Sequence, residues 1–439
     1  MYKKIIERFK NKNIAILGFG KEGKSTYNFI RKHLPNQHLT ILDGNEITVD
    51  NDKNVTLITG PTYIDNLNNY DYIIKSPGVK IPDEIMLNIK DKITSQMNIA
   101  LELYRDNIIG ITGTKGKSTT ASLLYKVLKD QNIDTLLLGN VGNPILDYID
   151  EIKENTILVI EMSSYQLELV EHSPHIGIIL NLFEDHLNYH GTVYLYHRSK
   201  LNMFKYQTNN DYSLYTSTND NMKNYMSNDN CISNIIDINK EFKIINDEIY
   251  YKDKLIYNKN QERYLLGEHN LSNILFVLKV IDILNLNIET AIKTINEFKP
   301  LEHRMEYVGT FNGIKYYNDT IATIPEATIN CLKAYTDVDT IIFGGMDRGI
   351  NYQSLIDYFN SSNIENFICM PETGHKLEKL INHGNKYIVS TLDEAVEIAK
   401  KVTKKACLLS PAAPSYNQFK NFEEKGNYYK EIIKQEKIW

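Results

Sequence analysis

Short apolar runs, rich in β-branched residues, alternate along the chain with longer stretches whose apolar positions recur every three or four residues. In the N-terminal part the apolar runs are NIAILG at 13–18, LTILD at 39–43 and DYIIKSPG at 71–78, and a helical pattern, KSTYNFIRKHL, separates the first two. Strand-length runs with helix-length spacers are typical of βαβ units in a parallel sheet. The pattern predicts a Rossmann-like α/β domain over residues 1–96.

The same alternation starts again near residue 107 and predicts a second α/β domain over residues 97–300. Its apolar runs are NIIGITG at 107–113, TLLLGN at 135–140, TILVIE at 156–161 and IGIILN at 176–181. One helix is expected from about Ser118, and another through Arg198 and Lys200. Alternating apolar and polar residues over 242–257 (FKIINDEIYYKDKLIY) predict antiparallel strands at the edge of this domain.

A segment with turn signals, FKPLEHRMEYV at 298–308, precedes a third region of α/β alternation, which includes IIFGGMDRG at 341–349 and ACLLSP at 406–411. We therefore predict a C-terminal Rossmann-like α/β domain over residues 301–439. A chain of 439 residues is too long for one core, so a multidomain α/β protein is the expected class.

Composition excludes several functional classes. The net charge is -6 without a long Lys/Arg run, so the sequence has no footprint for a nucleic acid or an anionic membrane. No apolar run is long enough to span a bilayer, and the first ten residues lack the apolar core of a signal peptide. The four cysteines have no C-x-x-C spacing, so neither a zinc site nor a disulfide framework is indicated. We expect a cytoplasmic protein.

Two glycine-rich loops compete for the role of phosphate-binding loop. The segment GFGKEGKS at 18–25 matches the pattern G-x-x-x-x-G-K-[ST], but it also matches G-x-G-x-x-G, with Asp43 ending the next strand 20 residues after Gly23. The segment GITGTKGKST at 110–119 fails the strict pattern, because Gly110 lies one residue too early. A tight turn without a ligand is the alternative interpretation of the first loop.

The chemistry around the second loop favours it as the ATP-binding loop. An apolar strand leads into Gly113, Gly116, Lys117 and Ser118, which open a helix, so backbone N–H groups converge where phosphates would lie. Glu161 ends a later apolar strand, the position where an acid that holds Mg²⁺ is expected. For Ser118 the alternative role is a helix N-cap.

Several further motifs follow this loop in a characteristic order. They are EMSSYQLE at 161–168, NLFEDHL at 181–187, GEHNLSN at 267–273, His303-Arg304, Asn318-Asp319, LSPAAPS at 409–415 and Asn421-Phe422-Glu423. With them the sequence resembles the Mur ligases over nearly its whole length. The resemblance implies an ATP-dependent, ADP-forming amide ligase of peptidoglycan precursor synthesis, with a central P-loop-type ATPase domain between two Rossmann-like domains.

The resemblance implies ATP and Mg²⁺ as cofactors and assigns residues to them. Lys117, His186 and Lys200 would be the catalytic residues. The residues implied for ATP are Gly113, Thr114, Lys115, Gly116, Lys117, Ser118, Thr119, Asn270, Asn273, Arg304 and Asp319. Those implied for metal are Ser118, Glu161, His186 and, if it is carbamylated, Lys200. Carbamylation requires a neutral amine, hence a depressed pKa near other cations.

Within the family, the sequence resembles the members that join glutamate to UDP-N-acetylmuramoyl-L-alanine. The residues implied for this UDP substrate are Gly18, Phe19, Gly20, Lys21, Asp43, Ser76, Asn140, Ser163 and Gln166. The first loop would then face a diphosphate, and Ser163 and Gln166 have the capping of a turn as their alternative role. Both substrates are small molecules, and a monomer is expected.

Thr323, Arg348, Ser415 and Phe422 are the residues implied for glutamate. Ile321 stands where a lysine is usual in these ligases, so a charged contact to the glutamate carboxylate is missing. A subgroup that adds L-glutamate has similar features, and we favour D-glutamate as the family default. More distant alternatives are a folylpolyglutamate synthase, which lacks the N-terminal UDP domain, and a nucleotide-binding regulator without catalysis.

Overall fold

The computed structural model describes residues 2–49, 52–140, 143–228, 231–246, 248–251, 253–258, 264–265, 268–299 and 302–435. The chain forms two compact units, one of Met1–Gln261 and Ser272–Ile295, the other of Glu262–Leu271 and Asn296–Trp439. A parallel sheet forms in each of the first two predicted regions, and a mostly parallel sheet forms in the third. The mixed α/β class is therefore confirmed.

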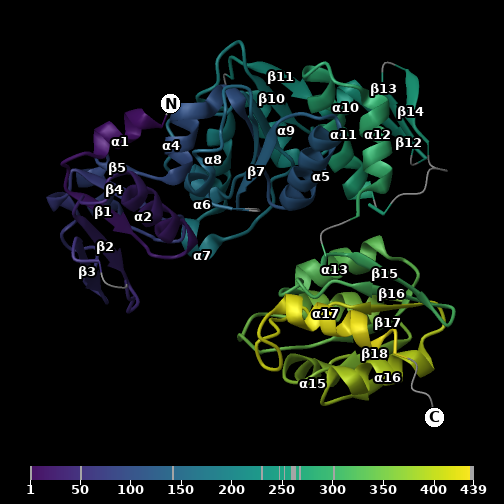
Figure 1. Ribbon diagram of the computed structural model, residues 1–439. Helices are drawn as coiled ribbons and strands as arrows, with labels where there is room; N and C mark the ends of the chain where they lie inside the picture. Colours follow the sequence, from purple (N-terminus) through teal and green to yellow (C-terminus); the bar gives the residue numbers. More distant parts are fainter. Residues whose placement is uncertain are drawn as a thin grey trace. The chain divides into compact units, whose positions relative to one another are not determined.

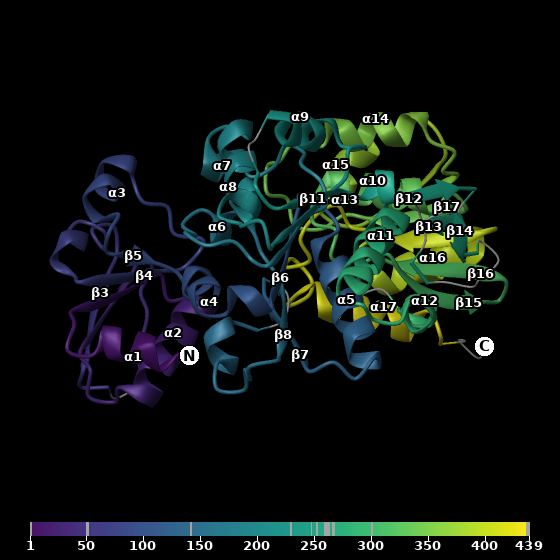
Figure 2. The same ribbon diagram turned by 90° about the horizontal axis from the view of Figure 1, so that it is seen from above.

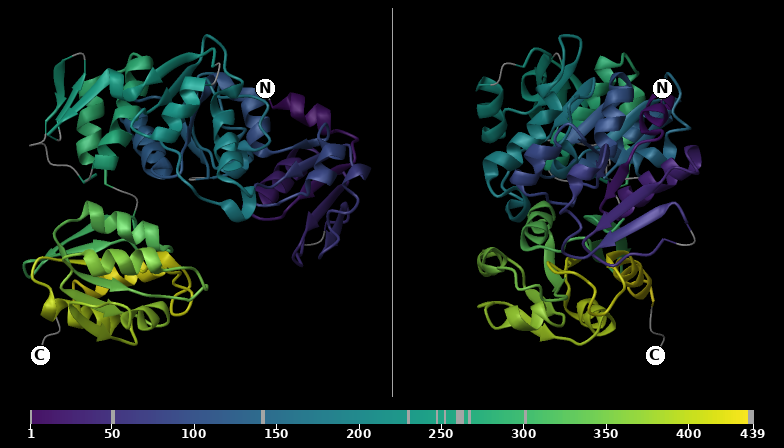
Figure 3. Two further views of the ribbon diagram at one scale, coloured as in Figure 1. Left: turned by 180° about the vertical axis from the view of Figure 1, so that it is seen from behind. Right: turned by 90° about the vertical axis from the view of Figure 1, so that its left-hand side faces the viewer.

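The N-terminal sheet is parallel, with the strand order β3-β2-β1-β4-β5. Its strands are β1 (Ile14–Leu17), β2 (Leu39–Asp43), β3 (Val55–Thr59), β4 (Tyr72–Lys75) and β5 (Ile93–Thr94). Helices α1 (Lys3–Phe9) and α2 (Lys21–His33) contribute to the core on one face, and α3 (Asp83–Ile89) contributes to the core on the other (labelled in Figure 2, and seen from two further directions in Figure 3). β1 and β4 are neighbours, so the residues that follow them lie close together.

The central sheet has the order β11-β10-β9-β6-β8-β7. Its strands are β6 (Ile108–Thr112), β7 (Thr135–Gly139), β8 (Ile157–Glu161), β9 (Ile176–Ile179), β10 (Tyr212–Tyr215) and β11 (Asn234–Asp237). The helices of this region are α4 (Gln96–Tyr104), α5 (Lys117–Asp130), α6 (Ser164–Leu167), α7 (Leu187–His190), α8 (Val193–Lys205) and α9 (Asp220–Asn228). β6 lies between β8 and β9, so the carboxyl ends of these three parallel strands meet at one edge.

A small antiparallel sheet follows, as the alternating pattern over 242–257 predicted. It contains β12 (Phe242–Ile245), β13 (Glu248–Tyr251) and β14 (Lys254–Tyr257), after α10 (Ile238–Glu241). Figures 1 and 2 show it beside α11 (Glu268–Ile283) and α12 (Ile288–Glu297). The Tyr251 hydroxyl donates to the Asp282 carboxylate of α11 over 2.8 Å, which ties the sheet to this helix.

The sheet of the second unit has the order β15-β16-β20-β17-β18-β19, in which only the β15–β16 hairpin is antiparallel among the described strands. Its strands are β15 (Glu306–Phe311), β16 (Ile314–Asn318), β17 (Val338–Phe343), β18 (Asn366–Cys369), β19 (Asn385–Ile388) and β20 (Ala406–Leu409). Its helices are α13 (Pro325–Ala334), α14 (Gln353–Ser361), α15 (Thr373–Glu378), α16 (Leu392–Val402) and α17 (Phe422–Ile432). Residues of α13, α14 and α15 join one core of this sheet, and those of α16 and α17 join another.

Membrane-spanning segments and cysteine pairing were two features that the sequence did not predict. Among the described residues, no helix is long and apolar enough to cross a membrane. Cys331, Cys369 and Cys407 are buried free thiols, and Cys231 is a half-buried one.

Candidate active site

The loop between β6 and α5 has a backbone conformation that glycine allows. Gly113 has φ +153° and Gly116, the residue before α5, has φ +85°. A side chain at Gly116 would lie 2.8 Å from the Asn273 amide oxygen of α11, so the close approach also requires glycine. α5 begins at Lys117, hence Ser118 lies inside the helix and is not its N-cap. The structure thus removes the alternative role that the sequence left for Ser118.

The end of β9 fixes the position of this loop. The Thr114 amide donates to the Asn181 carbonyl over 3.0 Å, and the Lys115 amide donates to the Asn181 side-chain oxygen over 2.9 Å. The Thr114 hydroxyl accepts hydrogen bonds from the Phe183 amide and from the Tyr196 hydroxyl of α8. These hydrogen bonds join the loop to the segment after β9 and to α8.

Two lysine side chains from different helices converge on the loop. Lys117 Nζ and Lys200 Nζ each donate to the Gly113 carbonyl oxygen over 2.9 Å, and Lys117 also donates to the Thr114 carbonyl. Lys200 is almost completely buried, at 1% exposure. Burial, followed by repulsion from the Lys117 ammonium, lowers the pKa of Lys200 well below its usual value. The site therefore concentrates positive charge and holds an amine that is unusually easy to deprotonate.

Glu161 is fully buried at the end of β8, the strand next to β6. Its Oε1 accepts a 2.6 Å hydrogen bond from Asn140 Nδ2, whereas its Oε2 is buried without a hydrogen-bond partner among the described residues. A buried carboxylate oxygen without a partner is costly unless a cation satisfies it. Asn140 lies after β7 and holds this carboxylate, a contact that the sequence did not predict.

His186 lies in a turn after β9, with a left-handed backbone at φ +52°. Its ring centroid is 5.2 Å from that of Tyr165 and 5.9 Å from that of Tyr196. Burial lowers the pKa of His186, and the neighbouring Asp185 opposes this shift. A neutral imidazole that is still 44% exposed is suited to coordinate a metal ion.

No group of three or more His, Cys, Asp and Glu side chains with metal-site geometry is found in the described part of the chain. The predicted metal ligands include only one carboxylate and one imidazole. Magnesium commonly takes the rest of its ligands from hydroxyls, water and substrate phosphates. The unpartnered oxygen of Glu161 fits such an ion, so the donor set agrees with Mg²⁺ bound together with a phosphate ligand.

The first glycine loop, between β1 and α2, also has a built geometry. A side chain at Gly23 would lie 2.0 Å from the Gly18 carbonyl oxygen, and Gly18 has φ +86°. Asp43 Oδ2 accepts a 2.7 Å hydrogen bond from the Phe19 amide, and the Ser76 hydroxyl donates to the Gly18 carbonyl over 2.8 Å. Asp43 and Ser76 thus hold the loop in shape. Gly20 precedes α2 and faces open space, and Lys21 is the first residue of that helix.

Ser163 and Gln166 form a capping box at the start of α6. Gln166 Nε2 also donates to Glu22 Oε1 of α2 over 2.6 Å, so this residue links the helix to the N-terminal sheet region. The capping that the sequence left as an alternative is therefore present for both residues. The adjacent buried Lys75 lies 3.2 Å from the Tyr189 hydroxyl and 3.6 Å from Glu168. The sequence predicted no role for Glu22, Lys75 and Tyr189, because their contacts join segments that lie far apart in the chain.

Asn270 and Asn273 are both buried in α11, at 7% and 5% exposure. Thr119 is half-buried in the first turn of α5. Arg304 and Asp319 belong to the second unit. There Asp319 is buried and accepts hydrogen bonds from the Met305 amide, over 3.1 Å, and from the Ser410 hydroxyl, over 2.9 Å. Burial raises the pKa of Asp319 to about 6.

The four residues implied for glutamate lie in the second unit and differ in exposure. Ser415 is buried at 3%, and its hydroxyl has no hydrogen-bond partner among the described residues. Arg348 is exposed and lies over the Tyr416 ring, 5.9 Å from its centroid. Thr323 and Phe422 are half-buried, and Phe422 is the first residue of α17. Of the four, Ser415 combines burial with an unsatisfied hydroxyl, which a polar ligand could satisfy.

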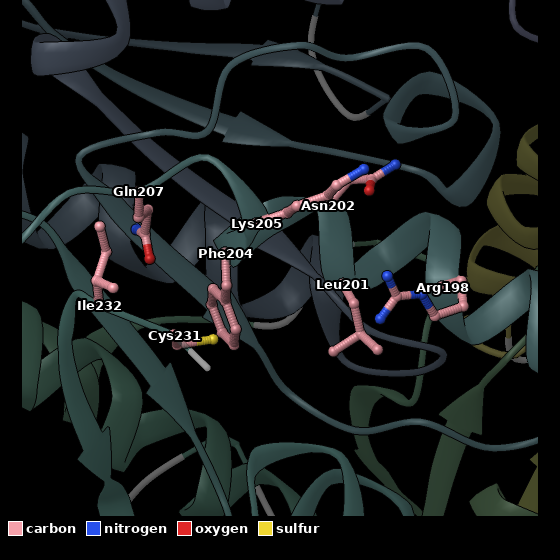
Figure 4. Close-up of a pocket in the computed structure, with 8 residues that line it drawn as sticks. All are labelled: Arg198, Leu201, Asn202, Phe204, Lys205, Gln207, Cys231 and Ile232. Atoms are coloured by element: carbon pink, nitrogen blue, oxygen red, sulfur yellow. The ribbon is translucent and has the colours of Figure 1, made fainter. Parts of the chain in front are cut away.

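A cavity of about 220 Å³ is lined in large part by residues of α8 other than Lys200 (Figure 4). It is lined by Arg198, Leu201, Asn202, Phe204, Lys205, Gln207, Cys231 and Ile232. None of these residues belongs to the predicted site, and Lys200 is not among them. This cavity is therefore separate from the candidate active site.

In the central sheet, β6 leads through a glycine loop into a helix, and a buried carboxylate ends the neighbouring strand β8. These features define an α/β protein with a P-loop-type phosphate site. The profile of the Mur ligase middle domain matches residues 111–281. A Bacillus cereus protein named UDP-N-acetylmuramoylalanine--D-glutamate ligase is 33% identical over 453 residues, which cover 98% of this chain and 99% of that protein. The chain belongs to the Mur ligase family.

Other relatives agree with this assignment. A Clostridium botulinum protein of the same name is 31% identical, and the match covers 98% of each chain. Among solved structures, the MurF ligase of Thermotoga maritima in complex with ADP has a TM-score of 0.59 at 16% identity, over 98% of this chain and 95% of that one. The UDP-N-acetylmuramate-alanine ligase MurC of the same organism has a TM-score of 0.55 at 16% identity, over 96% and 99%. These structures share the fold.

Proposed function

We propose that this protein is an ATP-dependent ligase that joins D-glutamate to UDP-N-acetylmuramoyl-L-alanine and releases ADP and phosphate. The observation that carries the proposal is the convergence of Lys117 and Lys200 on the Gly113 carbonyl, in a chain that matches ligases of this name over 98% of its length. The substrates are inferred from the names of the relatives. The phosphate site is inferred from the geometry, because the two lysines can bind phosphate and neutralise its charge.

In the first step a carboxylate oxygen of the UDP substrate attacks the γ-phosphorus of ATP, and the bond to the ADP oxygen breaks. The product is an acyl phosphate, which is a far better acyl donor than a carboxylate at neutral pH. Lys117 would contact the β- and γ-phosphates, and the N–H groups at the start of α5 would add the positive end of the helix dipole. The protein's contribution is to hold the reactants in position and to neutralise charge that develops on the phosphate.

Glu161, Ser118 and His186, with Lys200 if it is carbamylated, are the residues that would hold magnesium. When bound, the ion would neutralise phosphate oxygens and orient them. Asn140 positions Glu161 for this role, because its amide occupies one carboxylate oxygen and leaves the other available. The buried, unpartnered oxygen is the feature that supports metal binding here.

In the second step the amine of glutamate attacks the acyl carbon, and inorganic phosphate leaves. The amine must have lost its proton to act as a nucleophile. The new bond is an amide, and the products balance as amide, ADP, phosphate and one proton. Thr323, Arg348, Ser415 and Phe422 are the proposed contacts of the incoming amino acid. By the same proposal, Gly18, Phe19, Gly20, Lys21, Asp43 and Ser76 face the nucleotide of the UDP substrate.

The proposal is tested by measuring phosphate release with UDP-N-acetylmuramoyl-L-alanine and ATP, in parallel reactions with D-glutamate and L-glutamate. We expect release with D-glutamate and a product whose mass equals the two joined substrates less water. Release only with L-glutamate would keep the ligase and change the stereochemistry. Release with neither amino acid would refute the proposal.

Lys200→Met is expected to reduce phosphate release by roughly 10² to 10³-fold, because a positioned charge is lost from the reacting groups. The variant should remain folded, since Met replaces a buried side chain of similar length by an apolar one. The measurement is kcat with saturating substrates. Lys205→Met, an exposed lysine in the last turn of α8, is the matched control. Equal rates for both variants would remove Lys200 from the mechanism. Mass spectrometry of the intact protein in bicarbonate tests the carbamate separately.

A further inference from the structure

Lys425 is an unexpected buried cation in the second unit. It lies in the second turn of α17 at 2% exposure, and it is the one lysine or arginine below a tenth exposed among the described residues of this unit. Its ammonium donates to the Gly344 carbonyl over 3.3 Å. No ion pair joins it to a carboxylate among the described residues, and burial lowers its pKa to about 7. Such a charge is expensive to bury without a partner.

Hydrogen bonds link three segments, beginning with the loop whose Gly344 carbonyl accepts from this ammonium. Gly344 follows β17, and its amide donates to the Pro411 carbonyl over 2.9 Å. The Met346 amide donates to the Pro414 carbonyl over 2.8 Å, so the loop that leads to Arg348 is joined to the loop that ends in Ser415. The third segment is the start of α17, which contributes Phe422 and Lys425. The ammonium thus contacts the loop that leads to Arg348, and hydrogen bonds join that loop to the one that ends in Ser415.

Two close approaches in this region require glycine. A side chain at Gly345 would lie 2.3 Å from the Pro414 carbonyl oxygen, and a side chain at Gly426 would lie 2.1 Å from His303 Nδ1. Gly345 thus lets the loop after β17 pack against the loop after β20, and Gly426 lets α17 pack against the segment before β15. The Lys425 side chain is buried, and the Ser415 hydroxyl is buried without a hydrogen-bond partner among the described residues.

We propose that the Lys425 ammonium, together with the Ser415 hydroxyl, binds a carboxylate of the incoming glutamate, while Arg348 is available for the other carboxylate. The inference rests on the proposed function. Glutamate carries two carboxylates, and its amine must be neutral when it reacts, so its site needs two sources of positive charge. Arg348 is one such source and is exposed. Lys425 is the second, and a carboxylate beside it would favour its charged form.

This role and a purely structural role predict opposite effects on stability. If Lys425 only fastened the Gly344 carbonyl, its loss would destabilise the protein. If it binds an anion only in the complex, Lys425→Met removes a buried amine that has no ion-pair partner among the described residues and keeps the volume, so the free protein should be at least as stable. Glutamate binding would then be lost at no cost to the fold.

The test compares Lys425→Met with wild type and with Lys420→Met, an exposed lysine that precedes α17 by two residues. We expect the KM for glutamate to rise roughly 10- to 100-fold in Lys425→Met, as the loss of one charged hydrogen bond predicts. The KM values for ATP and for the UDP substrate should not change. Glutarate, which has both carboxylates and no amine, should inhibit the wild type and Lys420→Met but inhibit Lys425→Met much more weakly. The melting temperature of Lys425→Met should equal or exceed that of the wild type.

Each outcome is decisive. An unchanged KM for glutamate in Lys425→Met, with an active wild type, would overturn this inference and leave the proposed function intact. A lower melting temperature, or a variant that fails to fold, would assign Lys425 a structural role and would also overturn it. A wild type without activity towards glutamate would refute the proposed function itself.

Discussion

Lys117→Ala is expected to lower phosphate release by roughly 10² to 10³-fold or more with any amino acid substrate. The Lys117 ammonium lies at the mouth of the loop, where it donates to the Gly113 and Thr114 carbonyls over 2.9 Å, and phosphate would replace these weak acceptors. Alanine removes the charge that opposes the phosphates, but it favours helix and should not disturb α5. The measurement is kcat/KM for ATP from phosphate release.

Lys129→Ala is the matched control for this prediction. Lys129 lies in the last turn of α5, is exposed, and covers the Tyr125 ring, so its loss removes a lysine from the same helix without touching the loop. Its activity should stay close to that of the wild type. If Lys117→Ala kept wild-type activity, the loop over 110–119 would not be the ATP site, and the loop over 18–25 would have to be reconsidered.

Glu161→Gln is expected to lower activity by a similar factor and to remove the response to magnesium. Glutamine is nearly isosteric and can still accept the hydrogen bond from Asn140, so the end of β8 should keep its structure. The change removes the charge of a carboxylate whose Oε2 has no partner in the described structure. Without the ion, the variant should therefore be no less stable than the wild type.

The two effects are separated by titrating Mg²⁺ in the phosphate-release assay and by measuring melting temperatures with ATP, in the presence of Mg²⁺ or of a chelator. The wild type should be stabilised by Mg²⁺ with ATP, because a ligand that binds only the folded state raises its stability. Glu161→Gln should lose most of this gain, whereas Glu154→Gln, an exposed control just before β8, should keep it. Equal stabilisation of the wild type and Glu161→Gln would place the metal elsewhere.

The strand and helix pattern was sufficient to predict the class of fold. Apolar strand-length runs such as 108–112 and 157–161 are buried central strands, and the alternating segment over 242–257 is an antiparallel sheet. Such patterns are local, because a buried strand needs apolar residues wherever it lies in the chain. The pattern did not reveal that β8 and β9 flank β6, since the order of strands depends on contacts between distant segments.

The roles of individual polar residues were harder to predict. Ser163 and Gln166 were predicted as substrate contacts, with capping as their alternative role. The structure shows the capping box and a contact between Gln166 and Glu22, and the substrate contact stays a prediction. Ser118 could have been an N-cap, but the helix begins one residue earlier. A polar side chain in a motif can serve the backbone or a ligand, and its hydrogen-bond partner decides between these roles.

The sequence alone determined the loop over 110–119, the acid at the end of a buried strand and the order of motifs that is shared with ligases. Each of these motifs consists of consecutive residues, so it can be recognised without the fold. Tertiary structure decided what these residues touch. It brought Lys117 and Lys200 to one carbonyl oxygen, placed Asn140 beside Glu161 and buried Lys425 without a carboxylate partner among the residues that the structure describes. Burial and proximity between residues far apart in the chain arise only when the sheets and helices pack, and these two properties set the charge and the pKa values of the site.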